Sequence, residues 1–245
     1  MHLSEGKLSV AKEGSLLISP GYEGVTADWF QPSFWGADAA VVDEGGRGGA
    51  WFLDAGGDEF VLRHYRRGGL IGKFVERTYI YTGLLRARSF REFRLTRELI
   101  LAGLPVPNVI AAAVWRRSLC FYRAAIIVER IPEAVNLPSS TRVNSEKLWI
   151  QTGQMIRRFH DWGLDHVDLN CDNILVANDR TYLIDFDRCR RRDPSSSRQW
   201  QANNLQRLKR SVDKRLGLRA DLDVERLWQQ LLSGYHCARG YGTSD

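Results

Sequence analysis

The chain of 245 residues is long enough for one large domain or one domain of two lobes. Its 44% hydrophobic and 26% charged residues exclude a disordered or fibrous protein. A net charge of +6 and a pI near 9.3 favour an anionic partner, such as a nucleotide, a nucleic acid, an acidic sugar or a membrane surface, without choosing among them.

The cysteines give no sign of a disulfide framework or a zinc site. None belongs to a CxxC pair, and no histidine lies at zinc-ligand spacing from Cys120, Cys171, Cys189 or Cys237. The cytosol is therefore the expected compartment. Residues 1–20 lack a signal-peptide pattern, and no stretch approaches the roughly 20 apolar residues that a membrane span needs. We expect contact with a membrane only from outside the bilayer core.

The first part of the chain predicts a strand meander. Residues 1–33 are loosely patterned and predict an irregular extension. Strands are expected over 37–42, 51–53 and 60–65, because these runs are apolar or β-branched and Gly-rich turns separate them. The first of these turns, residues 44–49, is glycine-rich and by itself is typical of an ordinary hairpin.

Helices dominate the rest of the chain. A helix is predicted from Ser89 to about Ala102, ended by Gly103 and two prolines, and another over 145–162. Helical spacing of leucines returns from about Gln199. The polar, turn-rich stretch 132–144 predicts a boundary, so we expect one lobe over 1–131 and a second over 132–245.

Acidic and amide side chains gather just after this boundary, in two motifs at residues 166–175 and 183–187. Phosphoryl transfer from a nucleotide needs a carboxylate that orients the attacking hydroxyl and oxygen ligands that hold Mg²⁺. Asp168 supplies the first, and Asn173 and Asp185 supply hard oxygen ligands. The alternative is a polar loop between buried strands, where Asp and Asn only make turns. Two linked motifs at this separation favour the catalytic interpretation.

These motifs resemble the HxDxxxxN catalytic loop and the metal-binding aspartate of protein kinases and their relatives. The usual DFG is here Asp185-Phe186-Asp187, as in atypical kinase branches. The resemblance implies an α+β, protein-kinase-like fold of two lobes, with an antiparallel sheet in the N-lobe and a mainly helical C-lobe. It also implies ATP and Mg²⁺ as cofactors.

The same resemblance assigns nucleotide-binding residues upstream. A phosphate-covering loop would contain Gly45, Gly46, Gly48 and Gly49, although they do not form a clean GxGxxG. Arg63 occupies the place of the strand-three lysine of kinases and keeps its charge. His64 and Lys73 are nearby alternatives. Glu129 falls where kinases place the hinge whose backbone pairs with adenine.

Glu92 is the expected carboxylate partner of Arg63. Ser89-Phe90-Arg91-Glu92 also fits a helix-capping box, and Glu98 is a competing candidate. Glu92 is favoured because residues 103–107 have the distance and form of the post-helix turn in aminoglycoside-phosphotransferase-like kinases.

The segment after Asp185 predicts an acceptor other than a peptide. Ordinary protein kinases carry a long activation segment after the metal aspartate, but here a basic run, 188–194, leads quickly into a helix. The segment therefore favours a small-molecule, sugar or lipid kinase over a kinase that binds peptides.

Residues 29–214 resemble the 3-deoxy-D-manno-octulosonic acid (Kdo) kinases among the lipopolysaccharide kinases. The resemblance is carried by Leu62–Leu70 with Gly72 and Lys73, by 89–93 and 103–107, and by 204–211. It implies transfer of the ATP γ-phosphate to the 4-hydroxyl of Kdo on a lipid A precursor. It also implies peripheral binding at the cytoplasmic side of the inner membrane.

The basic run would then meet the anionic substrate or the anionic membrane surface, and it contains Arg188, Arg190, Arg191 and Arg192. A solvated helix or loop face is the alternative for such charges. Two other functions stay open: a heptose or other small-molecule kinase of the same fold, and a pseudokinase-like module that binds nucleic acid. The intact motifs and the absence of an aromatic stacking motif argue against nucleic acid. No protein partner is evident.

Overall fold

A computed structural model describes residues 6–11, 14–42, 49–65, 79–193 and 198–237. The chain forms two compact units: Met1–Ala102 with Pro107–Arg130, and Gly103–Val106 with Ile131–Asp245. The sequence placed the turn 103–106 in the first lobe. It groups with the second unit, where the Pro105 carbonyl accepts a hydrogen bond from the Leu183 amide at 3.0 Å.

An antiparallel sheet forms the centre of the first unit, with the order β1-β2-β7-β8-β5-β4-β3 and with β6 paired to β8. Its strands are β1 (Lys7–Ala11), β2 (Gly14–Ile18), β3 (Ala39–Val41), β4 (Ala50–Asp54), β5 (Glu59–His64), β6 (Tyr79–Ile80), β7 (Val109–Arg116) and β8 (Phe121–Glu129).

The expected irregular extension is replaced by β1 and β2, which pair with each other, and β2 also pairs with β7. Leu16 and Ile18 pack into one core cluster and Leu17 into another. The strand is therefore buried on both faces, and such a strand reads as a short continuous apolar run without alternation. That is why the sequence pattern missed it.

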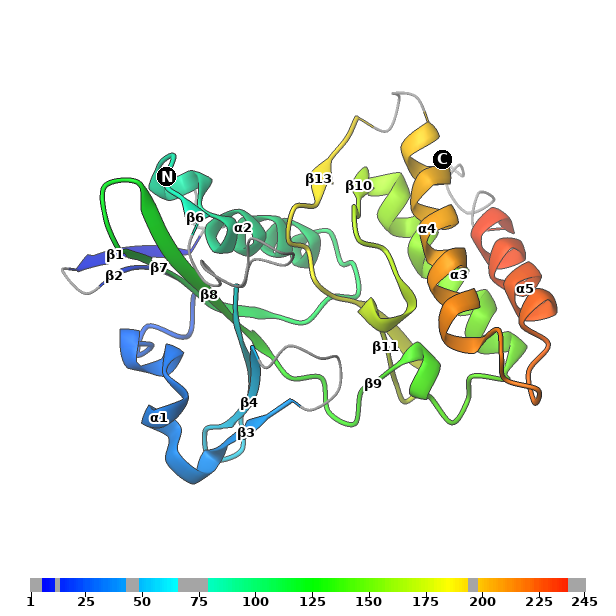
Figure 1. Ribbon diagram of the computed structural model, residues 1–245, viewed down its shortest axis with the longest axis horizontal. Coiled ribbons are helices and arrows are strands. Elements are labelled where there is room, and N and C mark those ends of the chain that lie inside the picture. Colours follow the sequence, from blue (N-terminus) through cyan, green and yellow to red (C-terminus); the bar gives the residue numbers. More distant parts are fainter. Residues whose placement is uncertain (1–5, 12–13, 43–48, 66–78, 194–197, 238–245) are drawn as a thin grey trace, which may run out of the picture. The chain divides into compact units, whose positions relative to one another are not determined.

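The two faces of this sheet are covered by different segments (Figure 1). Helix α2 (Arg88–Leu101) packs Phe90 and Phe93 against one face. The other face packs against Phe30 and its neighbours, which belong to the 3-10 helix η1 (Ala27–Phe30) and to α1 (Pro32–Trp35). Alternate side chains of β7 point to each side, as a strand with two buried faces requires.

The second unit is mainly helical (Figure 1), with α3 (Glu146–Trp162), α4 (Gln199–Leu216) and α5 (Val224–Cys237). Helices α3 and α5 approach so closely that only glycine fits at their contact. A Cβ on Gly153 would lie 1.9 Å from the Leu231 carbonyl oxygen, and one on Gly234 would lie 2.1 Å from that of Ile150.

Short strands complete the second unit: β9 (Val135–Asn136), β11 (Ile174–Ala177) and β12 (Arg180–Leu183) form one sheet. A second pair joins β10 (Leu164–Asp165) to β13 (Arg190–Arg191). Within the described part of the chain, no helix is both long and apolar enough to cross a bilayer.

Candidate active site

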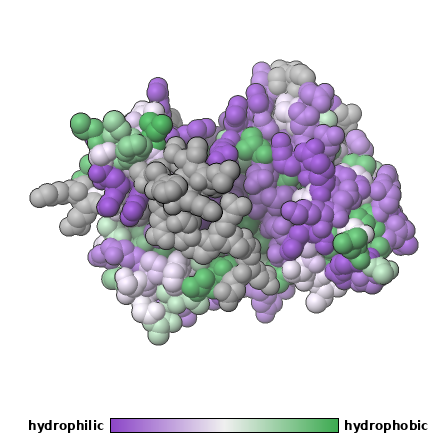
Figure 2. All heavy atoms as spheres, in the orientation of Figure 1, coloured by the Kyte–Doolittle hydropathy of each residue, from purple (hydrophilic) through white to green (hydrophobic). Residues whose placement is uncertain are grey.

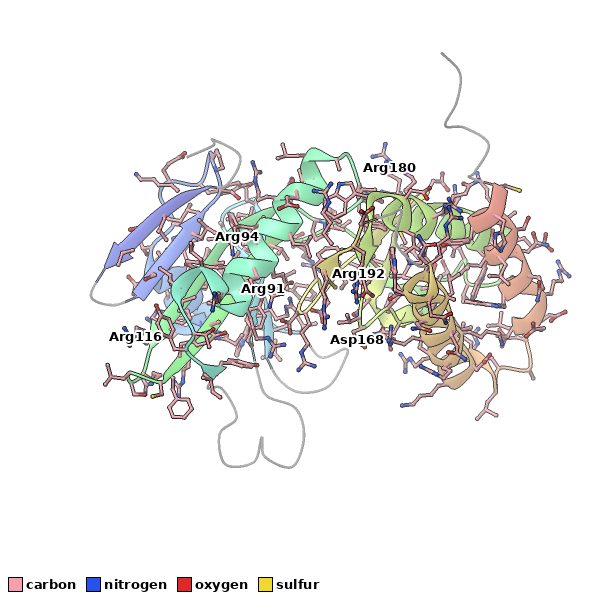
Figure 3. The ribbon with its side chains drawn as sticks, turned by 90° about the horizontal axis from the view of Figure 1, so that it is seen from above. Arg91, Arg94, Arg116, Asp168, Arg180 and Arg192 are labelled. Atoms are coloured by element: carbon pink, nitrogen blue, oxygen red, sulfur yellow. The ribbon has the colours of Figure 1, made fainter. Side chains whose placement is uncertain are left out.

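The loop after β10 fixes Asp168 through its backbone. The Asp168 carbonyl oxygen accepts hydrogen bonds from the side-chain amides of Asn170 and Asn173, both at 3.0 Å. The Leu169 amide also donates to the His166 carbonyl at 3.1 Å. The side chain of Asp168 is exposed (Figure 3). This arrangement holds the main chain rigid and leaves the carboxylate open to a reacting group.

Asn170 organises the turn that follows, and the sequence analysis passed it over. Its Oδ1 accepts from the amides of Asp172 at 3.0 Å and Asn173 at 3.1 Å. It thus caps the 3-10 helix η6 (Cys171–Asn173). An Asn just before a short helical turn is the available sequence signal, because its side chain satisfies the first free amides.

Asn173 and Asp185 belong to neighbouring segments, because the Ile184 amide donates to the Asn173 carbonyl at 3.1 Å. The Asn173 side-chain nitrogen is used on Asp168, which leaves its Oδ1 as an oxygen ligand. Asp185 is half-buried with φ 64°, a left-handed conformation that Asp adopts at a cost. One carboxylate and one amide oxygen form the type of set that holds Mg²⁺ beside phosphates. Among the described residues, no three His, Cys, Asp or Glu side chains gather at one point.

The buried His166 connects the catalytic loop with the segment that carries Ile184 and Asp185. Its Nε2 lies 3.0 Å from the Ile184 carbonyl oxygen, so the Nε2 proton is donated to that carbonyl. Burial lowers the pKa of His166, which keeps the ring neutral, and its Nδ1 is buried without a partner among the described residues. The ring meets Phe186 edge to face at 5.7 Å between centroids. Its role is therefore structural: it joins the catalytic loop to the segment that carries Asp185.

Two of the four arginines in the basic run have structural partners. Arg192 pairs with buried Asp165 at 3.0 Å, and Asn204 of α4 donates to the other oxygen of Asp165 at 3.1 Å. The guanidinium of Arg191 lies 4.4 Å from the centre of the Trp162 ring. Arg188, with φ 64°, and Arg190 are exposed. The sequence analysis missed Asp165 and Asn204, since an Asp at the end of a two-residue strand carries no distinctive pattern.

In the first unit, the structure brings Arg63 of β5 and Glu92 of α2 into an ion pair. Glu92 is 4% exposed, and its second oxygen accepts a hydrogen bond from the Tyr65 hydroxyl. The Arg63 side chain is 29% exposed, so part of the guanidinium still faces solvent. Tyr65 was missed as a partner. It is two residues from Arg63 on the same strand face, which is the signal that could have found it.

The capping-box interpretation of Ser89 is wrong. Helix α2 begins at Arg88, so Ser89 lies inside it, and its hydroxyl donates to the Ala113 carbonyl of β7 at 2.9 Å. The contact ties the helix to the sheet, and burial against the sheet decides the role of Ser89. The alternative carboxylate, Glu98, lies exposed on the same helix.

Only some of the other residues that were predicted to bind the nucleotide are among the described residues. Gly49 accepts the His64 amide at 2.9 Å beside β4, whereas Gly45, Gly46, Gly48 and Lys73 lie outside the described residues. Glu129 ends β8. Its amide donates to the Asn108 carbonyl at 2.8 Å, and its side chain accepts from the Asn108 amide nitrogen at 2.5 Å. The Glu129 amide is thus occupied.

Comparison with protein families gives one match over most of the chain. A model described as the lipopolysaccharide kinase (Kdo/WaaP) family matches residues 32–235. A 3-deoxy-D-manno-octulosonic acid kinase of Xanthomonas campestris pv. campestris is 45% identical over 218 residues, covering 88% of this chain and 86% of the relative. The enzyme of the same name from Stenotrophomonas maltophilia is 46% identical over 219 residues, with 89% and 87% covered.

Solved structures of low identity confirm the expected kinase-like fold. WaaP in complex with acyl carrier protein has a TM-score of 0.54 at 17% identity, covering 91% of this chain and 88% of that one. An aminoglycoside-3'-phosphotransferase of type VIII has 0.55 at 17%, covering 85% and 88%. The Rio2 kinase of Chaetomium thermophilum, solved with ADP, Mg²⁺ and phosphoaspartate, has 0.51 at 17%, covering 96% and 77%. At these identities the likeness is one of fold alone.

Proposed function

The chain belongs to the lipopolysaccharide kinase (Kdo/WaaP) family, and from this premise we propose that it is an ATP-dependent Kdo kinase of lipopolysaccharide core biosynthesis. It would transfer the γ-phosphoryl group to the 4-hydroxyl of a Kdo sugar on a lipid A precursor. The protein would work as a peripheral enzyme on the cytoplasmic side of the inner membrane. The observation that carries this proposal is 45% identity to a Kdo kinase over 88% of the chain.

Asp168 is the catalytic residue in this proposal. Its exposed carboxylate orients the 4-hydroxyl of Kdo and accepts the proton as the oxygen attacks the γ-phosphorus. The bond between the γ-phosphorus and the β,γ-bridging oxygen breaks, a bond to the sugar oxygen forms, and ADP leaves. The two amide contacts to the Asp168 carbonyl hold the main chain from which the carboxylate extends.

Asn173 and Asp185 would hold Mg²⁺. When bound, the ion would offset the negative charge that develops on the phosphates. The protein's own contribution is to fix the two ligands. The hydrogen bond between Ile184 and Asn173 holds their segments together, and His166 holds Ile184 from the other side.

Arg63 would contact the phosphates of ATP, oriented by Glu92. Loop glycines 45, 46, 48 and 49 would cover the phosphates, and the carbonyl of Glu129 would face adenine. Since the Glu129 amide is occupied by Asn108, adenine recognition through that amide is not part of the proposal.

The exposed arginines of the basic run are assigned to the acceptor. Arg188 and Arg190 would meet its carboxylate and phosphates, which are planar or tetrahedral oxyanions that guanidinium groups bind well. Arg191 and Arg192 have partners in Trp162 and Asp165. Their contribution to an anionic substrate or membrane surface would therefore be secondary to their structural contacts.

The test is incubation with ATP, Mg²⁺ and lipid A precursors that carry one or two Kdo residues, followed by mass spectrometry. We expect one added phosphate on a Kdo residue, and none with the Asp168→Asn variant. Addition to a heptose-containing acceptor only would show that the acceptor assignment is wrong. No transfer to any acceptor by a folded, ATP-binding wild-type protein would overturn the kinase proposal.

A further inference from the structure

One end of the first unit exposes large apolar side chains. Leu119, 83% exposed, lies in the turn between β7 and β8, and Phe121, 41% exposed, is the first residue of β8. Phe121 of β8 pairs with Ile80 of the neighbouring strand β6, and Ile80 is 61% exposed. Leu85 is 58% exposed in the 3-10 helix η4 (Leu84–Arg86). These four residues form the hairpin-end patch.

The patch is held together by backbone contacts within the first unit. The Tyr81 amide donates to the Cys120 carbonyl at 2.8 Å, which joins the segment after β6 to the β7–β8 turn. The Arg88 amide donates to the Tyr122 hydroxyl at 3.1 Å, and Arg94 of α2 donates to the Leu85 carbonyl. The hydropathy surface shows hydrophobic groups beside hydrophilic ones at this end of the unit (Figure 2). A fixed framework therefore presents the apolar side chains to solvent.

The charge around the patch has one sign. Residues 79–97 and 115–123 contain eight arginines and one acidic residue, Glu92, which is buried in its pair with Arg63. Arg86, Arg91 and Arg117 are exposed, and their side chains make no ion pair with the residues described. Arg91 and Arg94 lie three residues apart on α2, and Arg116 ends β7 (Figure 3). Within the described residues 79–97 and 115–123, exposed arginines therefore accompany the exposed apolar groups, and the one carboxylate is buried; the next carboxylate along α2 is the exposed Glu98.

We propose that the hairpin-end patch docks the protein on an anionic lipid surface. Leu119 and its apolar neighbours would enter the boundary between headgroups and acyl chains, and the arginines would contact the lipid phosphates. A projecting turn with single apolar side chains suits a soft layer, because a rigid protein partner needs a complementary hollow for each of them. This inference rests on the proposed place of the enzyme at a membrane surface. Because docking requires neither nucleotide nor sugar, its failure can be told apart from a failure of the proposed reaction.

The experiment is sedimentation of the full chain with vesicles of phosphatidylglycerol and phosphatidylethanolamine, or of phosphatidylcholine alone, across a salt series. Wild type should bind the anionic vesicles and lose binding as salt rises. Arg86→Gln/Arg117→Gln should weaken partitioning about 30-fold, about fivefold per arginine. Ile80→Ser/Leu119→Ser should weaken it about tenfold at every salt concentration, because apolar insertion is not screened.

Matched controls lie elsewhere on the chain. Leu101→Ser removes an equally exposed leucine from the far end of α2, and Arg210→Gln/Lys214→Gln removes two exposed charges from α4. Both should bind vesicles like wild type, and all variants should keep wild-type circular dichroism. Equal losses in patch and control variants would overturn the proposal. The proposal would also be wrong if the wild-type protein did not bind anionic vesicles, and an acidic protein would then be the better partner for the patch.

Cys120 offers a direct readout, since it is exposed between Leu119 and Phe121. In a Cys237→Ser variant, an environment-sensitive fluorophore on Cys120 should shift to the blue with anionic vesicles, and doxyl-labelled lipids should quench it. The same fluorophore on Cys237 in a Cys120→Ser variant should do neither. An unchanged spectrum at Cys120 in vesicle-bound protein would place the docking surface elsewhere.

Discussion

The two units treat their functional carboxylates in opposite ways. Glu92 in the first unit is 4% exposed, and its carboxylate accepts hydrogen bonds from Arg63 and Tyr65. Asp168 in the second unit is exposed, and its contacts are made by the backbone carbonyl. A buried, paired carboxylate sets the direction of its partner, whereas an exposed one is open to a reacting group. In the proposed reaction, this difference assigns positioning to the carboxylate of the first unit and proton transfer to that of the second.

This comparison can be broken by substitution. Removing an exposed side chain fixed through its backbone should change turnover and leave stability alone. Removing a member of a buried pair should change both, because the partner left behind is desolvated without compensation. The predictions below follow the expected loss of turnover, from the largest to the smallest.

Asp168→Asn should have the largest effect. Loss of the proton acceptor should lower kcat about 10³-fold, within the range of general base catalysis. The melting temperature and the affinity for ATP should stay near wild type, because the side chain is exposed. Single-turnover kinetics with a Kdo-lipid A precursor and a thermal melt measure both. A variant that turns over like wild type would remove Asp168 from the reaction.

Asp185→Asn should lower turnover about 10²-fold through weaker metal binding, since an amide replaces the charged ligand. Asn tolerates the left-handed conformation at φ 64°, so the fold should survive. The measurement is Mg²⁺ titration of nucleotide binding. Asp172→Asn is the matched control, because Asp172 is exposed and pairs with Arg215 at 3.1 Å. Identical titrations for Asp185→Asn and wild type would move the metal ligands elsewhere.

Arg63→Ala should raise the KM for ATP about tenfold and also cost about 1–3 kcal/mol of unfolding free energy, since the buried Glu92 loses its ion pair with Arg63. His64→Ala, on the neighbouring position of the same strand, should change neither by a comparable amount. Steady-state kinetics and urea unfolding provide the two numbers. A larger kinetic effect at His64 would reverse the assignment.

The accuracy of the sequence analysis differs between the two units for physical reasons. A catalytic loop could be predicted because phosphoryl transfer demands particular residues at particular spacing, as at Asp168, Asn173 and Asp185. Strand β2 was missed because burial on both faces removes the alternation that reveals a strand. Ser89 was assigned to a cap because local pattern competes with tertiary contact, and the hydrogen bond to Ala113 is invisible in sequence. Partners far apart in the chain, such as Asp165 and Asn204, follow from packing alone.

Asn170→Ala should have a smaller effect than the ligand variants. It removes one of two amide contacts to the Asp168 carbonyl and the cap of η6. We expect kcat to fall about tenfold and the unfolding free energy to fall by about 1 kcal/mol. Asn178→Ala, an exposed Asn after β11, is the control. Unchanged kcat would show that Asn173 alone fixes the loop.

The smallest effect on turnover at neutral pH is expected from His160, which links acid sensitivity to the second unit. Its Nδ1 lies 2.7 Å from the Tyr235 hydroxyl of α5. Burial lowers the pKa of His160 from its usual 6.5 to about 3 and raises the pKa of Tyr235 to about 12. The tyrosine therefore donates and the neutral imidazole accepts. The unfolded chain takes up a proton near pH 6.5 and the folded chain only near pH 3. Stability is thus complete above pH 6.5 and falls as the pH drops through this window.

Burial also lowers the pKa of His166. Both histidines belong to the second unit, so acid should destabilise that unit. Between pH 8 and pH 5.5 the protonation of His160 in the unfolded chain should lower the unfolding free energy by about 1 kcal/mol. His160→Gln should flatten the pH dependence, although its stability at pH 8 should be lower because the contact with Tyr235 changes. Urea unfolding at both pH values measures the slopes, and hydrogen exchange locates the loss. Amides of α3 and α5 should lose protection before those of β7 and β8. Earlier loss in the sheet would place the acid-sensitive group in the first unit, and an equal slope in the variant would show that His160 is not that group.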